Sequence, residues 1–247
     1  MSYSVKTGFR SSMSSVPRSS AAPARPPLPL PPQVGFNGIA QPLPRPDHHH
    51  ARTDSFREIR TRLLALAEGR NFVTLVVPVS PGSGGSYVAR HLALAFAFDE
   101  ARAALLIDCN FDRPSQHTAF GVDAVHGGLI DHLERPAREA PPTFYETGIP
   151  RMRLLPAGTA REAGIEYFST YRMRALIDSL RSAHPDRYLV LDGPALRGSA
   201  DARLLAGLAD FIVVVAAYGR DSAGRITQAV AGLDAKKIAG VVFNCPP

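Results

Sequence analysis

Residues 72–86 read FVTLVVPVSPGSGGS, and this stretch decides the fold class. Its first part, residues 72–77, is a short apolar run rich in β-branched residues and bounded by Pro78, a pattern typical of a strand buried on both faces of its sheet. After the Gly- and Ser-rich turn, Val88, Leu92 and Phe96 recur on one face of a helix. The sequence therefore predicts a strand, a glycine-rich turn and a helix that opens at Ser86.

The same alternation of strand-like and helical segments continues to the end of the chain. Further buried strands are predicted at 103–108, 153–155, 188–192, 211–216 and 238–244, and helices at 169–183 and 201–209. An earlier helix is predicted to be capped by Thr53 or Asp54, with Phe56, Ile59, Leu63 and Leu66 at helical spacing. This alternation favours an α/β fold with a doubly wound, mainly parallel sheet, whose ligands bind beyond the carboxyl ends of the strands.

Residues 1–52 differ in composition from the rest and are predicted to form a disordered, basic, proline-rich arm ahead of a domain at 53–247. Ten of the 22 prolines lie in the first 50 residues, where they remove amide donors and favour extended polyproline II backbone. Up to residue 53, six Lys and Arg residues face a single acidic residue, so nearly all of the net charge of +6 lies there. The body has no basic stripe with interleaved aromatics, so no nucleic-acid partner is expected. The sequence shows neither an apolar run of ~18 residues nor the pattern of a signal peptide.

The residues that carry chemistry follow the carboxyl ends of the predicted strands. Glycines let backbone N–H groups turn inward and a helix N-terminus favours an anion, so the candidate nucleotide-binding set is Gly82, Ser83, Gly84, Gly85, Ser86 and Tyr87. Asp108 and Asp192 each close a strand, and paired in space they would hold Mg²⁺ directly or through water, with the Ser86 hydroxyl as a further ligand. The alternative is that each aspartate only caps its own loop. Cys109 and Cys245 lie outside any metal-binding spacing and are expected to be ordinary thiols.

Several motifs, in their order along the chain, resemble those of the bacterial tyrosine kinases of capsule and exopolysaccharide systems, relatives of the MinD- and ParA-type P-loop ATPases. Residues 54–61, D-S-F-R-E-I-R-T, are similar to the family's helix motif E-x-x-R-x-x-R-T, and residues 81–86, P-G-S-G-G-S, to its Walker A, P-G-E-G-K-[ST]. Residues 108–114, D-C-N-F-D-R-P, are similar to D-x-D-x-R-R-P, and residues 189–195, L-V-L-D-G-P-A, to a Walker B that ends in D-[ST]-P-P. Shorter similarities lie at 128–133 and in LPAG at 155–158. The resemblance covers nearly all of residues 53–247.

The resemblance implies a P-loop NTPase-like domain that binds ATP and Mg²⁺. It also implies Asp108 and Asp192 as catalytic residues, and Asp54, Arg57 and Arg60 as contacts between the subunits of a ring, although the two arginines equally suit an ordinary solvated helix face.

Three departures from the motifs weaken the implied activity. Gly85 stands at the position of the Walker A lysine, Asn110 replaces a carboxylate, and Asp112 stands where the family has an arginine. The chain's lysines are Lys6, Lys236 and Lys237, all outside the loop. Losing the charge-assisted hydrogen bond of the lysine costs roughly 1.5–3 kcal/mol of binding, or about 10²–10³ in rate if the loss falls in the transition state. Binding of ATP and Mg²⁺ is therefore expected to be weakened or absent. Arg90, one turn after Ser86, is expected to point to solvent; the alternative is that it reaches a phosphate.

These departures favour a degenerate kinase-like protein, a pseudokinase, that regulates exopolysaccharide or capsule biosynthesis and export through an inner-membrane polysaccharide co-polymerase of the chain-length-regulator kind. Such a protein is expected to be cytoplasmic, peripheral at the inner membrane through that partner, and able to self-associate through residues 54–61. The alternatives are an active ATP-dependent protein tyrosine kinase and a MinD- or ParA-like ATPase of a polysaccharide-assembly system. No tyrosine follows Tyr218, so phosphorylation of a C-terminal tyrosine cluster is not expected.

Overall fold

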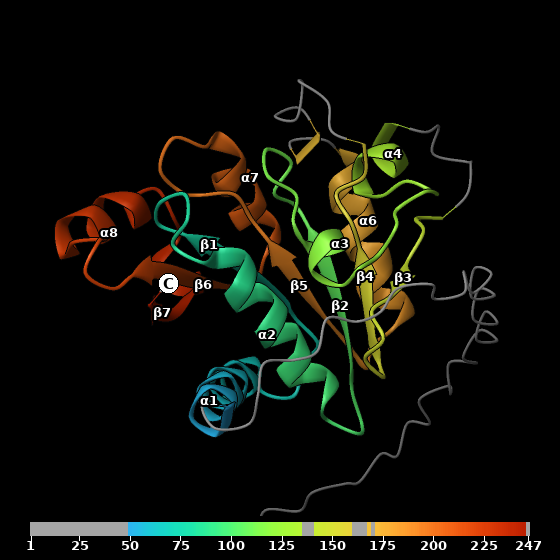
Figure 1. Cartoon of the computed structure of the whole chain (residues 1–247), viewed down its shortest axis with the longest axis horizontal. Helices are drawn as coiled ribbons and strands as arrows, with labels where there is room; N and C mark the ends of the chain where they lie inside the picture. The colour runs from blue at the N-terminus through green and yellow to red at the C-terminus, as the bar shows by residue number, and fades with distance from the viewer. Residues whose placement is uncertain (1–48, 135–140, 160–166, 169–170, 246–247) are drawn as a thin grey trace, which may run out of the picture.

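A seven-stranded, mainly parallel sheet forms the centre of the protein (Figure 1). The computed structural model describes residues 49–134, 141–159, 167–168 and 171–245. The strands are β1 (Val73–Pro78), β2 (Ala103–Asp108), β3 (Tyr145–Glu146), β4 (Met152–Leu155), β5 (Arg187–Asp192), β6 (Phe211–Ala217) and β7 (Ile238–Asn244). Their order is β3-β4-β2-β5-β1-β6-β7, and every neighbouring pair is parallel except β3 and β4. The predicted α/β class and mainly parallel sheet are confirmed.

Helices cover both faces of this sheet and give it two hydrophobic cores. The helices are α1 (His49–Ala67), α2 (Gly85–Ala97), α3 (Gln116–Ala119), α4 (Leu129–Glu134), α6 (Tyr171–Ala183), α7 (Ala200–Leu208) and α8 (Ala223–Val230), with a 3₁₀ turn at Ala235–Lys237. Buried residues of α1 and α2 share one core, whereas α4, α6, α7 and α8 contribute to the other. Because side chains alternate along a strand, Leu75 and Leu105 point to the second core while Val76 and Leu106 point to the first.

Helix α1 differs from its prediction at both ends. It begins at His49, so Thr53 and Asp54 lie inside the helix rather than at its cap, and the expected boundary at residue 52 falls within it. The rest of the predicted arm, residues 1–48, lies outside the described residues. Near the C-terminal end, Leu66 is 44% exposed and Ala67 is buried, because each residue turns the helix by about 100° and only one of the two can follow the face of Phe56 and Leu63.

Two short similarities noted in the sequence, at 128–133 and 155–158, meet in space and form one structural unit. The Leu129 amide donates to the Pro156 carbonyl at 2.8 Å, and the Asp131 carboxylate accepts from the Gly128 amide at 2.7 Å and the Thr159 amide at 3.1 Å. A Cβ at Gly128 would lie 2.3 Å from the Pro156 oxygen, so only glycine fits there. This unit ties α4 to the end of β4.

The described helices contain no stretch that combines the length and the apolar character needed to cross a bilayer.

Candidate functional site

A loop between β1 and the start of α2 offers free backbone donors at the carboxyl edge of the sheet. β1 ends at Pro78 and α2 begins at Gly85, one residue earlier than predicted, after Gly84 with a left-handed φ of 90°. The first turn of a helix leaves its amides without helical acceptors. Among the described residues the amides of Gly85, Ser86 and Tyr87 have no acceptor, and no side chain caps this end. The residues of this phosphate loop (residues 81–86) are therefore arranged to receive an anion.

The phosphate loop forms one wall of a cavity of about 530 Å³. The other walls come from the loops that follow β2 and β5, and β5 lies between β2 and β1 in the sheet. The side chains that line it beyond the phosphate loop include Asn110, Asp112, Arg113 and Arg197. The cavity thus lies where three parallel strands end, the place where ligands bind in sheets of this type.

Gly85, at the position where a lysine would complete the motif, is packed tightly against the end of β1. A Cβ at residue 85 would lie 2.6 Å from Cδ of Pro78 and 2.8 Å from its Cγ, so any side chain there displaces the proline ring. The two lysines among the described residues do not line the cavity. Lys237 instead donates through Nζ to the carbonyls of Ala206 and Gly207, both at 3.2 Å, near the end of α7. The phosphate loop therefore has no lysine to offer a phosphate.

Asp221 binds the underside of the loop, a contact that no local sequence pattern indicated. Its carboxylate accepts hydrogen bonds from the Ser80 hydroxyl at 2.8 Å, the Ser83 hydroxyl at 2.7 Å and the Ala217 amide at 2.8 Å. Burial alone would raise the pKa of Asp221, but these hydrogen bonds hold it below its usual value. Ser83 is fully buried, so of the predicted nucleotide-binding set it is the member whose side chain serves the loop rather than the cavity.

Asp108 and Asp192 meet as predicted at the ends of paired strands, and both are fully buried. Asp108 accepts from the amides of Asn110 at 3.1 Å, Ser115 at 3.0 Å and Gln116 at 3.1 Å, so its carboxylate organises the loop after β2. Burial raises the pKa of Asp108. Burial and then the charge of Asp108 raise the pKa of Asp192 to about 7.

Gln116, which the sequence did not single out, links the carboxylate pair to the phosphate loop. Its Nε2 donates to Oδ2 of Asp192 at 2.7 Å and to the Ser86 carbonyl at 2.9 Å. Nothing in the local sequence marks this residue, because its partners are 30 and 76 positions away.

Two side-chain oxygens between the carboxylate pair and the phosphate loop have no hydrogen-bond partner and suit a hard cation. Oδ1 of Asp192 and Oε1 of Gln116 are buried and have no hydrogen-bond partner, and Mg²⁺ prefers oxygen ligands such as these and the Ser86 hydroxyl. The described residues contain no cluster of three His, Cys, Asp or Glu side chains for a metal ion, so waters and phosphate oxygens would complete the coordination. The residues fit Mg²⁺ at Asp192 and Ser86 better than at Asp108, whose oxygens already accept three amides.

Arg90 lies beside these carboxylates, and the expectation that it points to solvent is wrong. Burial lowers its pKa, and the charges of Asp192 and then Asp108 oppose that shift. Its Nε is buried without a hydrogen-bond partner. The guanidinium is held here because α2 packs directly against β5 and β2, which carry the two aspartates.

The candidate subunit-contact residues lie away from this site, on α1. Arg60 donates through Nη1 to the Ala95 carbonyl of α2 at 2.8 Å, so it makes a contact within the chain. Arg57 is exposed on the same helix. The side chain of Asp54 lies outside the described residues. Cys109 is buried and Cys245 exposed, and both are free thiols.

Comparison with known proteins gives relatives of one kind. No protein-family model matches the sequence. EpsB of Ralstonia solanacearum, which is named as a tyrosine-protein kinase, is 30% identical to this chain over 195 residues. The match covers 77% of this chain and 25% of EpsB. The tyrosine-protein kinase YwqD of Bacillus subtilis is 26% identical over 196 residues, covering 78% of this chain and 80% of YwqD. The succinoglycan biosynthesis transport protein ExoP of Rhizobium meliloti is 30% identical over 188 residues, 74% of this chain and 23% of ExoP. The chain thus spans about a quarter of the length of EpsB and ExoP.

Solved structures show the same fold. The chimerical protein CapA2B2 matches with a TM-score of 0.70 and 22% identity over 81% of this chain and 88% of its own. The kinase domain of Escherichia coli tyrosine kinase ETK matches with a TM-score of 0.69 and 23% identity over 78% of this chain and 75% of its own. MinD of Pyrococcus horikoshii, complexed with Mg-ADP, matches with a TM-score of 0.54 and 20% identity over 70% of each chain. The chain is therefore a homologue of the bacterial tyrosine-protein kinases of exopolysaccharide systems, built on the P-loop fold that they share with MinD- and ParA-like proteins.

Proposed function

We propose that this protein is a degenerate relative of the exopolysaccharide-system tyrosine kinases, one that holds a nucleotide at its phosphate loop but transfers phosphoryl groups poorly. The observation that carries the proposal is the combination at residue 85: free amides of a helix N-terminus face a cavity, while Pro78 fills the space in which a lysine side chain would begin. The amides serve binding, and the missing cation is a group that stabilises the charge that develops in phosphoryl transfer.

The site keeps the residues that would bind a nucleotide but lacks groups that phosphoryl transfer would use. The amides of residues 85–87 and the Ser86 hydroxyl bind phosphate oxygens, and Gln116 keeps Asp192 beside Ser86. When bound, Mg²⁺ would neutralise phosphate charge at Ser86 and Asp192. Asp108 is poorly placed to take a proton from a substrate because it is fully buried and three amides bind its carboxylate, and the neutral Asn110 cannot take its place. Transfer therefore lacks a lysine, and the two carboxylates beside the loop are fully buried.

The same protein would act on polysaccharide assembly through a membrane partner. ExoP is named as a biosynthesis transport protein, and the relatives EpsB and ExoP are about four times longer than the segment that this chain matches. We infer that this protein works at the cytoplasmic side of the inner membrane, bound to a polysaccharide co-polymerase. Whether nucleotide is bound to it would regulate the assembly or export of the polysaccharide. The predicted arm ahead of α1, residues 1–48, would extend from the globular part as a tether.

Calorimetric titration of the full chain with ATP, with and without Mg²⁺, tests the proposal, combined with transfer of radiolabelled γ-phosphate. ATP is expected to bind, with turnover about 10²–10³ below that of a lysine-bearing relative. Asp192→Ala tests the carboxylate, and Asp178→Ala, an exposed carboxylate on α6, is the matched control. Absence of ATP binding would contradict the proposed function.

A retained kinase or ATPase activity is the second candidate, because two arginines, Arg113 and Arg197, line the cavity and bring positive charge to it. Phosphate transfer to a protein acceptor, or release to water, would then proceed at the rate of a lysine-bearing relative. Such a rate, abolished by Asp192→Ala and unchanged by Asp178→Ala, would establish this candidate and overturn the degenerate one.

A further inference from the structure

We propose that Arg197 supplies the positive charge to a phosphate bound at residues 84–86, in place of the lysine that the loop lacks. The inference rests on the proposed function, since it concerns the phosphate that this loop would hold. It assigns a binding role to a residue that lies outside every motif noted in the sequence.

The backbone of Arg197 is fixed beside the point where the missing side chain would start. The amide of Leu196 donates to the Pro78 carbonyl at 2.9 Å, and the amide of Arg197 donates to the Val79 carbonyl at 3.3 Å. Pro78 is also the residue whose ring lies 2.6 Å from the position of a Cβ on Gly85. Arg197 therefore begins next to the same proline that excludes a lysine.

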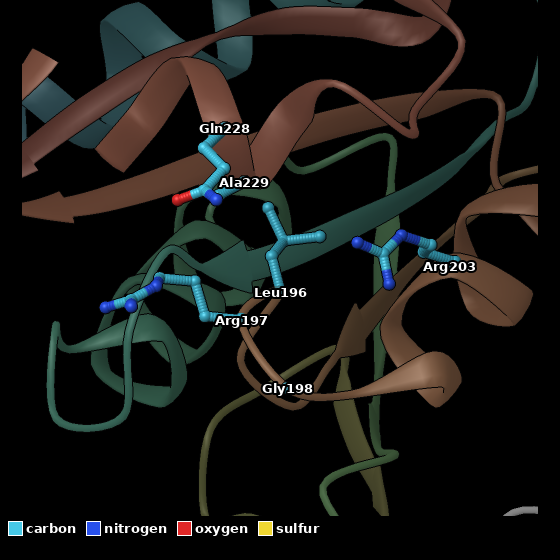
Figure 2. Close-up of a pocket in the computed structure, with 6 residues that line it drawn as sticks. All are labelled: Leu196, Arg197, Gly198, Arg203, Gln228 and Ala229. Atoms are coloured by element: carbon cyan, nitrogen blue, oxygen red, sulfur yellow. The ribbon is translucent and has the colours of Figure 1, made fainter. Parts of the chain in front are cut away.

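The Arg197 side chain is available to a ligand. It is exposed, and among the described residues no hydrogen bond or ion pair engages its guanidinium. Arg197 lines the phosphate-loop cavity together with Gly84, Gly85 and Ser86, and it also borders a second cavity of about 190 Å³. Figure 2 shows this second cavity, where the Arg197 guanidinium extends away from Leu196 toward the ribbon of the phosphate loop.

Arg203 provides the contrast within the same view. Its guanidinium turns toward Leu196 in Figure 2, and its Nε lies 2.8 Å from the position of a Cβ on Gly232. Arg203 borders the second cavity and does not line the phosphate-loop cavity. Two arginines of equal charge thus lie near each other, and only one of them faces the proposed phosphate.

The charges around the loop explain why a guanidinium matters there. Asp221 lies directly beneath the loop with its pKa held low, and Asp112 lines the cavity. Arg220 partly offsets Asp221, but its Nη2 already donates to the Pro81 carbonyl at 3.2 Å and the Ser83 hydroxyl at 3.3 Å, whereas among the described residues no such contact engages Arg197. Arg113 also lines the cavity but is adjacent to Asp112 in the same loop. A planar guanidinium can bind two phosphate oxygens at once, which suits Arg197 to the task.

Calorimetric titration of the full chain with ATP and with inorganic pyrophosphate tests the assignment. Arg197→Ala is expected to weaken binding of both ligands roughly 10- to 100-fold, and Arg197→Lys should restore part of the loss. Arg203→Ala is the control and should leave both dissociation constants within about twofold. Because Arg197 is exposed, its variants should keep the wild-type melting temperature, which is measured alongside.

The outcomes separate the inference from the function on which it rests. If the wild type binds both ligands and Arg197→Ala binds them equally well, the inference is overturned and the proposed function stands. The inference is also overturned if Arg113→Ala, and not Arg197→Ala, removes the affinity. If the wild type binds neither ligand, the proposed function and the inference fall together.

Discussion

The surroundings of Asp192 in the structure could not be read from its position in the sequence. In the sequence it closes an apolar strand, whereas in the structure it is fully buried, lies in register with Asp108 and accepts a hydrogen bond from Gln116. Burial and the neighbouring carboxylate raise its pKa to about 7, well above that of an unfolded chain. The proton that Asp192 keeps in the folded state makes stability depend on pH.

The sign of that dependence follows from the raised pKa. The contribution of Asp192 to the free energy of unfolding is present in full below about pH 4 and is lost as pH rises toward 7, because only the folded state then holds the proton. Asp192→Asn keeps an acceptor for Gln116 and does not titrate, so its stability relative to the wild type should increase from pH 5 to pH 7, by at most about 1.4 kcal/mol per pH unit.

Urea unfolding at pH 5, 6 and 7 measures this difference, with Asp178→Asn on the exposed side of α6 as the control. A stability difference between Asp192→Asn and the wild type that stays constant across this range would show that Asp192 does not carry the proton.

At the scale of elements, the turn from β1 to α2 is fixed from several sides. Pro78 meets Gly85 across it, Asp221 binds it from below, and the Asn244 side-chain amide at the end of β7 donates to the Ser83 carbonyl at 3.1 Å. These residues lie at the carboxyl end of β1, in the loop after β6 and at the carboxyl end of β7. The loop is therefore set by the strands around it, and a change at residue 85 has to be matched at residue 78.

Gly85→Lys should consequently fail to restore a working loop by itself. Its Cβ would overlap Cδ and Cγ of Pro78, at 2.6 and 2.8 Å, and we expect a loss of about 1–3 kcal/mol in the free energy of unfolding. Pro78→Ala removes both overlapping atoms and leaves only Cβ, at 3.1 Å. The double variant should therefore recover part of the loss, with a coupling of about 0.5–3 kcal/mol in a double-mutant cycle measured by urea unfolding.

Two outcomes of this cycle would contradict the packing argument. One is a Gly85→Lys protein as stable as the wild type, and the other is a double variant whose loss equals the sum of the single losses.

At the scale of the whole molecule, the sheet separates two cores, and α1 and α2 cover one face (Figure 1). Helix α1 is held by Phe56, by the Arg60 bond to α2 and by Nε of Arg62, which donates to the Ala239 carbonyl of β7 at 2.9 Å. Its exposed side carries Arg57 and Glu58. A contact between subunits through this helix would use that side.

Arg57→Ala is therefore the variant that tests self-association. Because Arg60 also holds α2, Arg60→Ala would mix assembly with folding, whereas Arg57→Ala should lower the sedimentation coefficient of an oligomer and leave the melting temperature unchanged. Glu58→Ala, on the same exposed side, is the matched control. Identical monomer profiles for the wild type and Arg57→Ala in sedimentation velocity would end the proposal of subunit contacts through residues 54–61.

The sequence by itself determined the elements, because strand burial and helical periodicity are local properties. Segments 103–108 and 238–244 were predicted as strands with the bounds that β2 and β7 have, and the glycine-rich turn was placed correctly between β1 and α2. The sequence missed the two-residue β3, the helices α3, α4 and α8, and the start of α1. It also showed directly that the loop has no lysine.

Only the tertiary structure decided which residues of the site contact one another, because these contacts join residues far apart in the chain. Gln116 meets Asp192 across 76 positions, and Ser83 meets Asp221 across 138. These meetings depend on the strand order β2-β5-β1-β6, which places four loops at one edge of the sheet and which no local pattern encodes. Arg197, which follows β5, lies beside Pro78 and Val79 at the end of β1 for the same reason. The sequence thus showed which group the loop lacks, and the fold decided which residues surround the gap.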